Sequence, residues 1–329
     1  MKKILALTTG IAVLLFSCKP DNNQQNGNDN IPEKPVAPRI KGPDFSGDSA
    51  YAFVKAQVDF GPRVPGTPAH EACGNYLIGK LKAFGATVSV QEAPATTYDG
   101  RAIRMKNIFG QYYPERKDRI LLLAHWDTRH IADRDSVRQK EPILGANDGG
   151  SGVGVLLELA RMLNQKDPGI GVDILFVDAE DYGEPGGASE TWCLGSQYWS
   201  QHMPAGYNAR FAILLDMVGA KDAVFPREGT SVYYASNVVE KVWTAAAALG
   251  YRDLFINDVT GQTTDDHLFI NEYARIPAID IVHYDPMKMD YGHFHHRHSD
   301  NMDNIDPVVM KKVGTVLIDV IYNELPVVH

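Results

Sequence analysis

The chain has 329 residues, of which 44% are hydrophobic, and it carries a formal net charge of −9 at pH 7. That length can bury one large core, so we expect a single domain once the N-terminus is set aside. An acidic chain without a basic face does not favour nucleic acid or an anionic membrane surface, because it offers no cluster of cations to the phosphates. Small-molecule or peptide substrates suit this charge better.

The N-terminal segment, residues 1–18, has the pattern of an export signal. Two lysines precede an apolar run that is too short to span a bilayer, and the run ends at Cys18. Its last four residues, Leu-Phe-Ser-Cys, resemble a bacterial lipobox, in which the cysteine is acylated; Phe16 is unusual there, so a plain cleaved signal is the alternative. Residues 19–47 are rich in Asn, Gln and Pro and predict a disordered tether, which leaves 48–329 as the globular domain. A signal followed by a tether indicates an envelope protein that meets the membrane only through its lipid anchor.

From residue 48 onward the sequence alternates between helical and strand-like periodicities. Two helical stretches within 50–84 are separated by the Gly and Pro residues of DFGPRVPGTPAH, which do not continue a helix. The later elements are predicted, in chain order, as strands at 107–113 and 119–125, a helix at 151–164, a strand at 172–181, a helix at 196–202, a strand at 211–219, a helix at 237–249, a strand at 276–285 and a helix at 308–323. Strands that alternate with helices predict an α/β fold, with a mostly parallel sheet covered by helices on both faces.

Two cysteines, Cys73 and Cys193, follow the signal segment and lie far apart in the sequence. They could form a disulfide in an oxidising compartment or remain as two buried thiols. The sequence leaves both possibilities open.

Acidic residues and histidines gather where the predicted strands end. The strands run into AHWD, DAED, LDMVG and VHYD, and a Gly-rich turn, GANDGG, precedes the helix at 151–164. Ligands of such sheets bind beyond the carboxyl ends of the strands, so we expect these side chains to meet there. The set consists of His125, Asp148, Glu180, Asp181, Asp216 and one late histidine.

A cation is the simplest reason for such a set. Taken singly, His125 could end a strand and Asp148 could cap a helix. Brought together, these carboxylates would repel one another unless a positive ion held them. Mixed His, Asp and Glu ligands indicate zinc before calcium or magnesium.

The motifs AHWD, GANDGGSG, DAED and LDMVG, followed by a late histidine, resemble the zinc aminopeptidase superfamily, which includes the animal-type (type II) glutaminyl-peptide cyclotransferases. The similarity extends from FGPRVPG at 60–66 to DNMDNID at 300–306. The runs AHWDTR, EDYG, WCLGSQYWS and TDDH are most similar to the lipid-anchored or periplasmic glutaminyl cyclases of diderm bacteria. The resemblance implies a single α/β/α sandwich and a location in the cell envelope.

The resemblance also selects one histidine from the stretch HFHHRHSD. The last ligand of the superfamily is a histidine with an aspartate four residues later and another six residues beyond that. His296 fits, with Asp300 and Asp306. His293 and His298 miss this register, and we expect them beside the site or facing solvent.

Two activities of the superfamily remain open, and they differ in what the metal does. In a cyclase, the resemblance implies one zinc held by Asp148, Asp181 and His296. Glu180 would move a proton from the substrate's α-amine to the departing ammonia. Asp216 and Asp265 would lie hydrogen-bonded beside it and share a proton.

In an aminopeptidase, the resemblance implies two zinc ions. His125 and Asp216 would bind one ion, Asp181 and His296 the other, and Asp148 would bridge them. Glu180 would then be the base that activates a water molecule.

Asp265 favours the cyclase, because the aminopeptidases usually carry Ser where TDDH has this acid. An extra carboxyl next to Asp216 would engage that residue and deny it to a second zinc.

Trp192 and Trp126 are candidate walls of the substrate pocket, with core packing as the alternative for each. His295 stands where the cyclases have Trp, which counts against the cyclase and alters the edge of the pocket.

We therefore predict a zinc-dependent glutaminyl-peptide cyclotransferase. It would convert the N-terminal Gln of peptides or proteins to pyroglutamate with release of ammonia, act as a monomer and bind no nucleic acid. The alternative is a two-zinc aminopeptidase. A binding lipoprotein that has lost catalysis is disfavoured because no ligand position is missing.

Overall fold

The computed structural model describes residues 39–324. The predictions for the signal segment, for Cys18 and for the tether up to residue 38 lie outside this range. The globular domain starts earlier than the predicted residue 48, because Phe45 is only 3% exposed and the Ile40 amide donates to Asn323 Oδ1 at 2.8 Å. No helix within 39–324 combines the length and apolar character needed to cross a bilayer.

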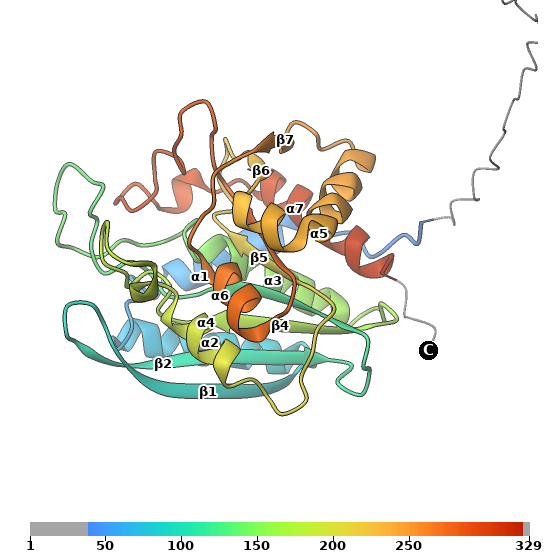
Figure 1. The fold of residues 1–329 in the computed structure, drawn as a ribbon, viewed down its shortest axis with the longest axis horizontal. Coiled ribbons are helices and arrows are strands. Elements are labelled where there is room, and N and C mark those ends of the chain that lie inside the picture. The colour runs from blue at the N-terminus through green and yellow to red at the C-terminus, as the bar shows by residue number, and fades with distance from the viewer. Residues whose placement is uncertain (1–38, 325–329) are drawn as a thin grey trace, which may run out of the picture. The chain divides into compact units, whose positions relative to one another are not determined.

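A six-stranded sheet forms the centre of the fold (Figure 1). Its order is β1 (Thr87–Thr96), β2 (Ala102–Tyr112), β4 (Gly171–Val177), β3 (Arg119–His125), β5 (Ala212–Asp216) and β8 (Ala278–Val282). The last four strands are parallel to one another, while β1 and β2 pair antiparallel at one edge. The predicted α/β fold is confirmed, and the sheet is mixed with mostly parallel strands. A separate two-stranded sheet joins β6 (Phe225–Arg227) and β7 (Phe255–Val259).

Helices cover both faces of the central sheet. One face packs against α1 (Gly47–Val58), α2 (Pro68–Ala83), α3 (Gly150–Leu163), α5 (Gly229–Ala248) and α7 (Pro307–Tyr322). The other face packs against α4 (Leu194–Gln201) and the helical turns α6 (Asp266–Phe269) and η2 (Ile270–Ala274). Along β3, Ile120 and Leu122 join the first core and Leu121 and Leu123 the second, as alternation along a strand buried on both faces requires.

The glycine-rich start of α3 brings this helix close to the sheet. A Cβ atom on Gly152 would lie 2.2 Å from the Leu215 carbonyl oxygen of β5, and one on Gly154 would lie 2.9 Å from the Ala50 carbonyl oxygen of α1. Larger residues would push the helix outward. The close contact sets Asp148, just before α3, beside the end of β5.

Candidate metal centre and active site

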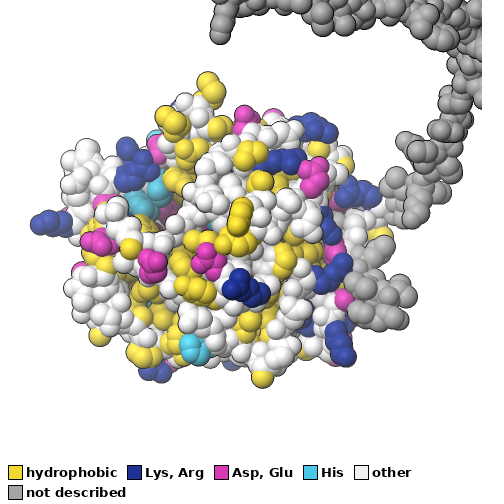
Figure 2. Space-filling view, viewed as in Figure 1, with side chains coloured by type: hydrophobic (Ala, Val, Ile, Leu, Met, Phe, Trp, Pro, Cys, Tyr) yellow, Lys and Arg dark blue, Asp and Glu magenta, His cyan; other side chains and the backbone are white. Residues whose placement is uncertain are grey.

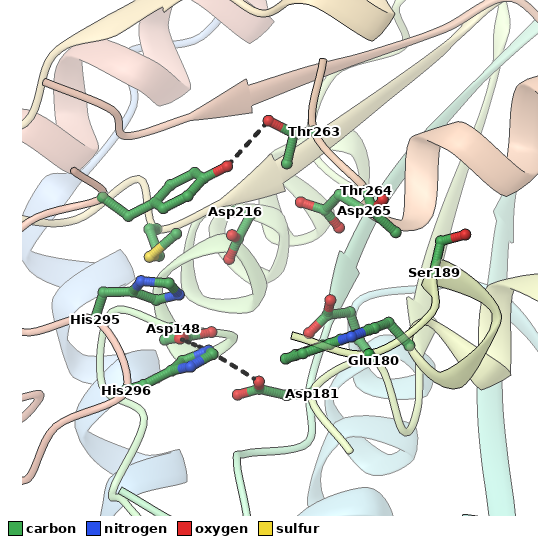
Figure 3. A pocket seen from close by; sticks show the side chains of 14 residues that line it. Asp148, Glu180, Asp181, Ser189, Asp216, Thr263, Thr264, Asp265, His295 and His296 are labelled. Atoms are coloured by element: carbon green, nitrogen blue, oxygen red, sulfur yellow. Dashed lines mark hydrogen bonds and ion pairs between the residues drawn. The ribbon is translucent and has the colours of Figure 1, made fainter. Parts of the chain in front are cut away.

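A cavity opens beyond the carboxyl ends of the parallel strands, where the sequence places the acidic motifs (Figure 3). Asp216 ends β5, Glu180 and Asp181 follow β4, and Asp265 caps α6. The lining residues are Asp148, Glu180, Asp181, Gly187, Ser189, Trp192, Asp216, Met217, Thr263, Thr264, Asp265, Tyr291, His295 and His296.

Asp148 and Asp181 both lie close to His296 in this cavity. His296 Nε2 lies 3.2 Å from Asp181 Oδ1 and 3.8 Å from Asp148 Oδ2. Ligand atoms that are each 2.0–2.2 Å from a tetrahedral zinc are separated by roughly 3.3–3.6 Å. His296 Nε2 therefore lies near this separation from each aspartate, and Figure 3 shows the three side chains together in the cavity. His295 also offers a nitrogen within 4.8 Å of Asp148 and His296.

Two buried oxygen atoms support the same interpretation. Asp148 Oδ2 and Asp181 Oδ2 have no hydrogen-bond partner among the described residues, although both side chains are almost fully buried. A buried carboxylate oxygen without a partner is costly, and a bound cation removes that cost. The side chains present therefore fit zinc.

Neighbouring acids orient the three ligands. Asp133 Oδ1 lies 3.3 Å from His296 Nδ1, which leaves the Nε2 lone pair free to face the metal position. Asp300 accepts hydrogen bonds from the amides of Asn147 and Asp148 at 2.8 and 3.0 Å. The Asp300 carboxylate therefore fixes the backbone that carries Asp148.

The chain after β4 is held in the same way. Asp127 accepts hydrogen bonds from the amides of Glu180 and Asp181 at 3.1 and 3.2 Å. Arg129 Nη1 donates to the Asp181 carbonyl oxygen at 2.9 Å, and Arg129 Nε donates to Asp133 Oδ1 at 2.6 Å. Arg129 thus contacts both Asp133, which orients His296, and the backbone of Asp181.

The backbone around the cavity is strained. Ala179, Cys193, Met217 and His296 adopt positive φ angles between 49° and 56°, a region that residues other than glycine rarely occupy. Such conformations persist only where the surrounding structure holds them, and they often occur at functional sites. Their concentration here agrees with an active site.

His125 and Asp216 form a second group next to Asp148. His125 Nε2 lies 3.2 Å from both Asp148 Oδ1 and Asp216 Oδ1. These three side chains could bind a second ion. Without one, the His125 N–H can serve both carboxylates. The structure therefore brings together the predicted ligands of both the one-zinc and the two-zinc arrangement.

Glu180 is placed for proton transfer. Burial, together with the charges of Asp181 and Asp265, raises its pKa well above the usual range even though His125 opposes the shift. Glu180, Cys193 and Asp265 each offer an atom within 4.8 Å of the others, and Cys193 Sγ donates to Glu180 Oε1 at 3.5 Å. A buried carboxyl with a raised pKa can both accept and return a proton near neutral pH.

The pKa of Asp216 depends on its neighbour Asp265. Burial raises the pKa of Asp216 to about 7, and the neighbouring charges of Asp148 and Asp265 add to this. A residue that sequence analysis did not single out, Asp280 of β8, offers an oxygen within 4.8 Å of Asp265, and burial, together with the charges of Asp265 and Asp216, raises its pKa well above the usual range. Its place inside the apolar strand AIDIV was a signal that could have found it.

One predicted wall of the pocket is wrong. Trp126 is fully buried, and its ring stacks on His70 at 4.1 Å, so it belongs to the core and does not line the cavity. Trp192 does line it, with its indole almost parallel to the His296 ring and 6.1 Å from it. Gly183 permits this position, because a Cβ there would lie 1.8 Å from the indole.

The remaining histidines behave as their register indicates. His295 lines the cavity. His293 is exposed and contacts Asn304 at 3.1 Å, while the partly buried His298 contacts the Arg138 carbonyl oxygen at 3.2 Å. Asp133 and Tyr291 are site residues that sequence analysis missed, because nothing in their local sequence marks them, and Arg129 ends the run AHWDTR but was given no role there.

Comparisons with known proteins agree with this geometry. The family model described as "Peptidase family M28" matches residues 107–321. A glutaminyl cyclase from Bacteroides thetaiotaomicron, crystallised with N-acetylhistamine, is 54% identical, with a TM-score of 0.85 over 86% of this chain and 100% of that one. A structure described as a leucine aminopeptidase precursor from the same organism is 53% identical, with a TM-score of 0.82 over 87% and 99%.

Curated relatives are more distant. Aminopeptidase YwaD of Bacillus subtilis is 27% identical over 86% of this chain but only 59% of its own length, and the match to the uncharacterized protein YfbL of Escherichia coli spans 30% of that protein. The chain thus spans less than two thirds of these two relatives. Because the family model covers more than half of the sequence and the zinc ligands converge as the superfamily resemblance implies, the chain belongs to peptidase family M28.

Proposed function

We propose that the protein is a zinc-dependent glutaminyl-peptide cyclotransferase, which converts the N-terminal glutamine of peptides or proteins to pyroglutamate and releases ammonia. The observation that carries the proposal is the acid pair of the partly buried Glu180 and the buried Asp265, within 4.8 Å of each other beside the zinc ligands. A water-activating peptidase needs one carboxylate base, whereas moving a proton between two nitrogen atoms of one substrate suits a carboxyl with a raised pKa. The 54% identity to a glutaminyl cyclase supports the same conclusion.

The reaction joins two atoms of the same substrate. The α-amine nitrogen attacks the γ-amide carbon, the bond from that carbon to the amide nitrogen breaks, and ammonia leaves. Glu180 takes the proton that the α-amine loses and returns it to the departing nitrogen, so its carboxylate is restored at the end of each cycle. Zinc bound by Asp148, Asp181 and His296 would supply the polarisation of the γ-carbonyl oxygen.

The cavity walls hold the glutamine in a reactive position. Trp192 offers a rigid apolar face to the side chain, and its own position is fixed by the Arg129 guanidinium, 4.6 Å from the ring centre. Holding the amine near the amide carbon converts the reaction into an efficient intramolecular step.

We further propose that one zinc ion is sufficient. In this arrangement His125 donates its Nε2 hydrogen to Asp148 and Asp216, and Asp216 faces Asp265 instead of a second ion. Asp265 in turn lies beside Asp280, which offers an oxygen within 4.8 Å of it.

A two-zinc aminopeptidase is the second candidate function. It is favoured by one observation, the group of His125, Asp148 and Asp216, whose imidazole nitrogen lies 3.2 Å from each carboxylate. The similarity to a structure described as a leucine aminopeptidase precursor supports it as well.

The deciding experiment offers the purified zinc-loaded protein a Gln-initiated peptide and a Leu-initiated peptide. We expect ammonia and a peptide lighter by one ammonia from the first, and no free leucine from the second. Release of leucine with an unchanged Gln peptide would make the aminopeptidase the function of this chain.

The location of the enzyme is a separate proposal. The pattern of residues 1–18 supports export and acylation of Cys18 in the envelope of a diderm bacterium. Labelled palmitate should be incorporated into the wild-type chain and not into the Cys18→Ala variant. Equal labelling of both would show that Cys18 is not the acylated residue.

A further inference from the structure

The edge of the cavity carries a hydrogen-bonded chain of three side chains that the proposed mechanism does not use. Arg134 Nη1 donates to His295 Nδ1 at 2.5 Å, and Arg134 Nη2 donates to Asp290 Oδ1 at 2.7 Å. Arg134 is exposed and Asp290 partly exposed, whereas His295 lines the cavity. These hydrogen bonds therefore link the solvent-facing lip to the interior of the cavity, where Figure 3 shows His295 opposite the acids.

This contact fixes which nitrogen of His295 carries hydrogen. A guanidinium has five N–H donors and no acceptor, so the nitrogen that faces it must accept. Nδ1 therefore presents its lone pair to Arg134, and the ring hydrogen lies on Nε2. Tyr291 and His296 pack on the ring, with centroids 4.9 and 3.9 Å away, and they limit its rotation.

Arg134 is itself held in place. Its second amino group is bound to Asp290, so the guanidinium cannot swing away without breaking an ion pair. An exposed ion pair of this kind adds little to stability, which leaves the orientation of His295 as its main effect.

We propose that His295 donates its Nε2 hydrogen to the main-chain carbonyl oxygen of the substrate's N-terminal glutamine, and that Arg134 is the positioning residue that fixes this donor. The proposal rests on the proposed function, because that function defines which substrate groups remain free. The zinc ligands and Glu180 face the γ-amide and the α-amine. Asp148, which offers an oxygen within 4.8 Å of a His295 nitrogen, is taken up by zinc in this arrangement, so the first peptide carbonyl, on the way out of the cavity past the lip, is the acceptor left for His295.

An imidazole can present a hydrogen on either nitrogen, so His295 needs Arg134 to define which nitrogen donates. A substrate of any sequence supplies the carbonyl, so this contact selects for a peptide or amide at the first residue and not for its neighbour.

The test compares two substrates of the zinc-loaded enzyme, L-glutamine amide and (R)-4-aminopentanamide, which keeps the α-amine and the γ-amide in the same configuration but has a methyl group in place of the main-chain carbonyl. We expect His295→Phe and Arg134→Met to lower kcat/KM roughly tenfold on glutamine amide, mainly through KM, and to leave the second substrate unaffected. Arg134→Lys, which keeps a donor, should recover most of the loss. Arg138→Met, which removes an exposed arginine paired with Glu141 in the same loop, is the matched control.

A second measurement does not depend on turnover. In 15N spectra of the zinc-loaded protein, assigned with the His295→Phe variant, His295 should show a protonated Nε2 and an unprotonated Nδ1, and Arg134→Met should mix the two tautomers. Equal losses on both substrates, or a protonated Nδ1 in the wild type, would overturn the inference. Failure of the wild type to cyclise glutamine amide would instead remove the proposed function, while the tautomer could still be read.

Discussion

Replacing Asp133 by Asn tests whether the ligand geometry depends on its support. The Asp133 carboxylate lies 3.3 Å from His296 Nδ1 and accepts from Arg129 Nε at 2.6 Å. Although partial burial opposes ionisation, these two partners hold the pKa of Asp133 below its usual range, so it is charged at neutral pH. Asn keeps the shape and one acceptor oxygen but removes the charge that strengthens the imidazole as a ligand.

The expected effect follows from the type of contact that is lost. Removing a partner of a metal-bound histidine lowers metal affinity by roughly 10–100-fold, and because Asn still accepts from Nδ1 we expect the lower end, about tenfold or 1.4 kcal/mol.

Zinc affinity can be measured by competition with a chelating dye, with Asp303→Asn, an exposed acid away from the ligands, as the control. An unchanged zinc affinity in Asp133→Asn, or an equal loss in both variants, would refute the reasoning about His296.

Three further predictions follow from the same structure. Glu180→Gln should lower kcat by roughly 10²–10⁴-fold while the zinc content, measured by elemental analysis, stays at the wild-type value; normal turnover would remove Glu180 from proton transfer. Cys73 and Cys193 are free and buried, and burial raises the pKa of Cys73 to about 11 and that of Cys193 well above 9. Neither thiol should therefore react with a disulfide reagent at pH 8 until urea unfolds the chain. Rapid reaction of the native protein would contradict this prediction. For Glu228, burial raises the pKa, but hydrogen bonds from His267, Thr230 and Ser231 outweigh it and lower the value to about 2. A depressed carboxyl pKa stabilises the fold above the unfolded value of 4.5, here by about 3 kcal/mol, and this stabilisation is lost as the pH falls through the folded value of about 2. Urea unfolding should show Glu228→Gln less stable than wild type by about this amount at pH 7 and by only about 1 kcal/mol at pH 2.5. A pH-independent difference would contradict the argument.

The parts of the fold that sequence analysis predicted best are those with strong apolar patterns. The strand RILLLAH and the helix at 151–164 are buried along nearly their whole length, so their composition marks them. β1 (Thr87–Thr96) was missed because it is an edge strand, mostly exposed and containing Pro94. α5 begins at Gly229 and not near 237, since it contains a kink at Ala235 that interrupts the helical periodicity.

In the candidate site, too, some residues could be predicted from the sequence and others could not. The zinc ligands follow strands and stand in motifs, so their meeting at one edge of the sheet could be predicted. Asp133 and Arg129 lie in the loop after β3, and only the folded path of that loop brings them beneath His296 and Asp181. Trp126 could have been placed correctly, because the residue after His125, whose ring faces Asp148 and Asp216, points to the opposite side of the sheet.

The central claim is that one zinc ion sits between Asp148, Asp181 and His296, and the most direct test is anomalous diffraction at the zinc edge from crystals of the zinc-loaded protein. The account predicts one strong peak about 2.0–2.2 Å from Asp148 Oδ2, an Asp181 carboxylate oxygen and His296 Nε2. A second peak of equal height between His125 and Asp216, or a peak away from all three ligands, would contradict it.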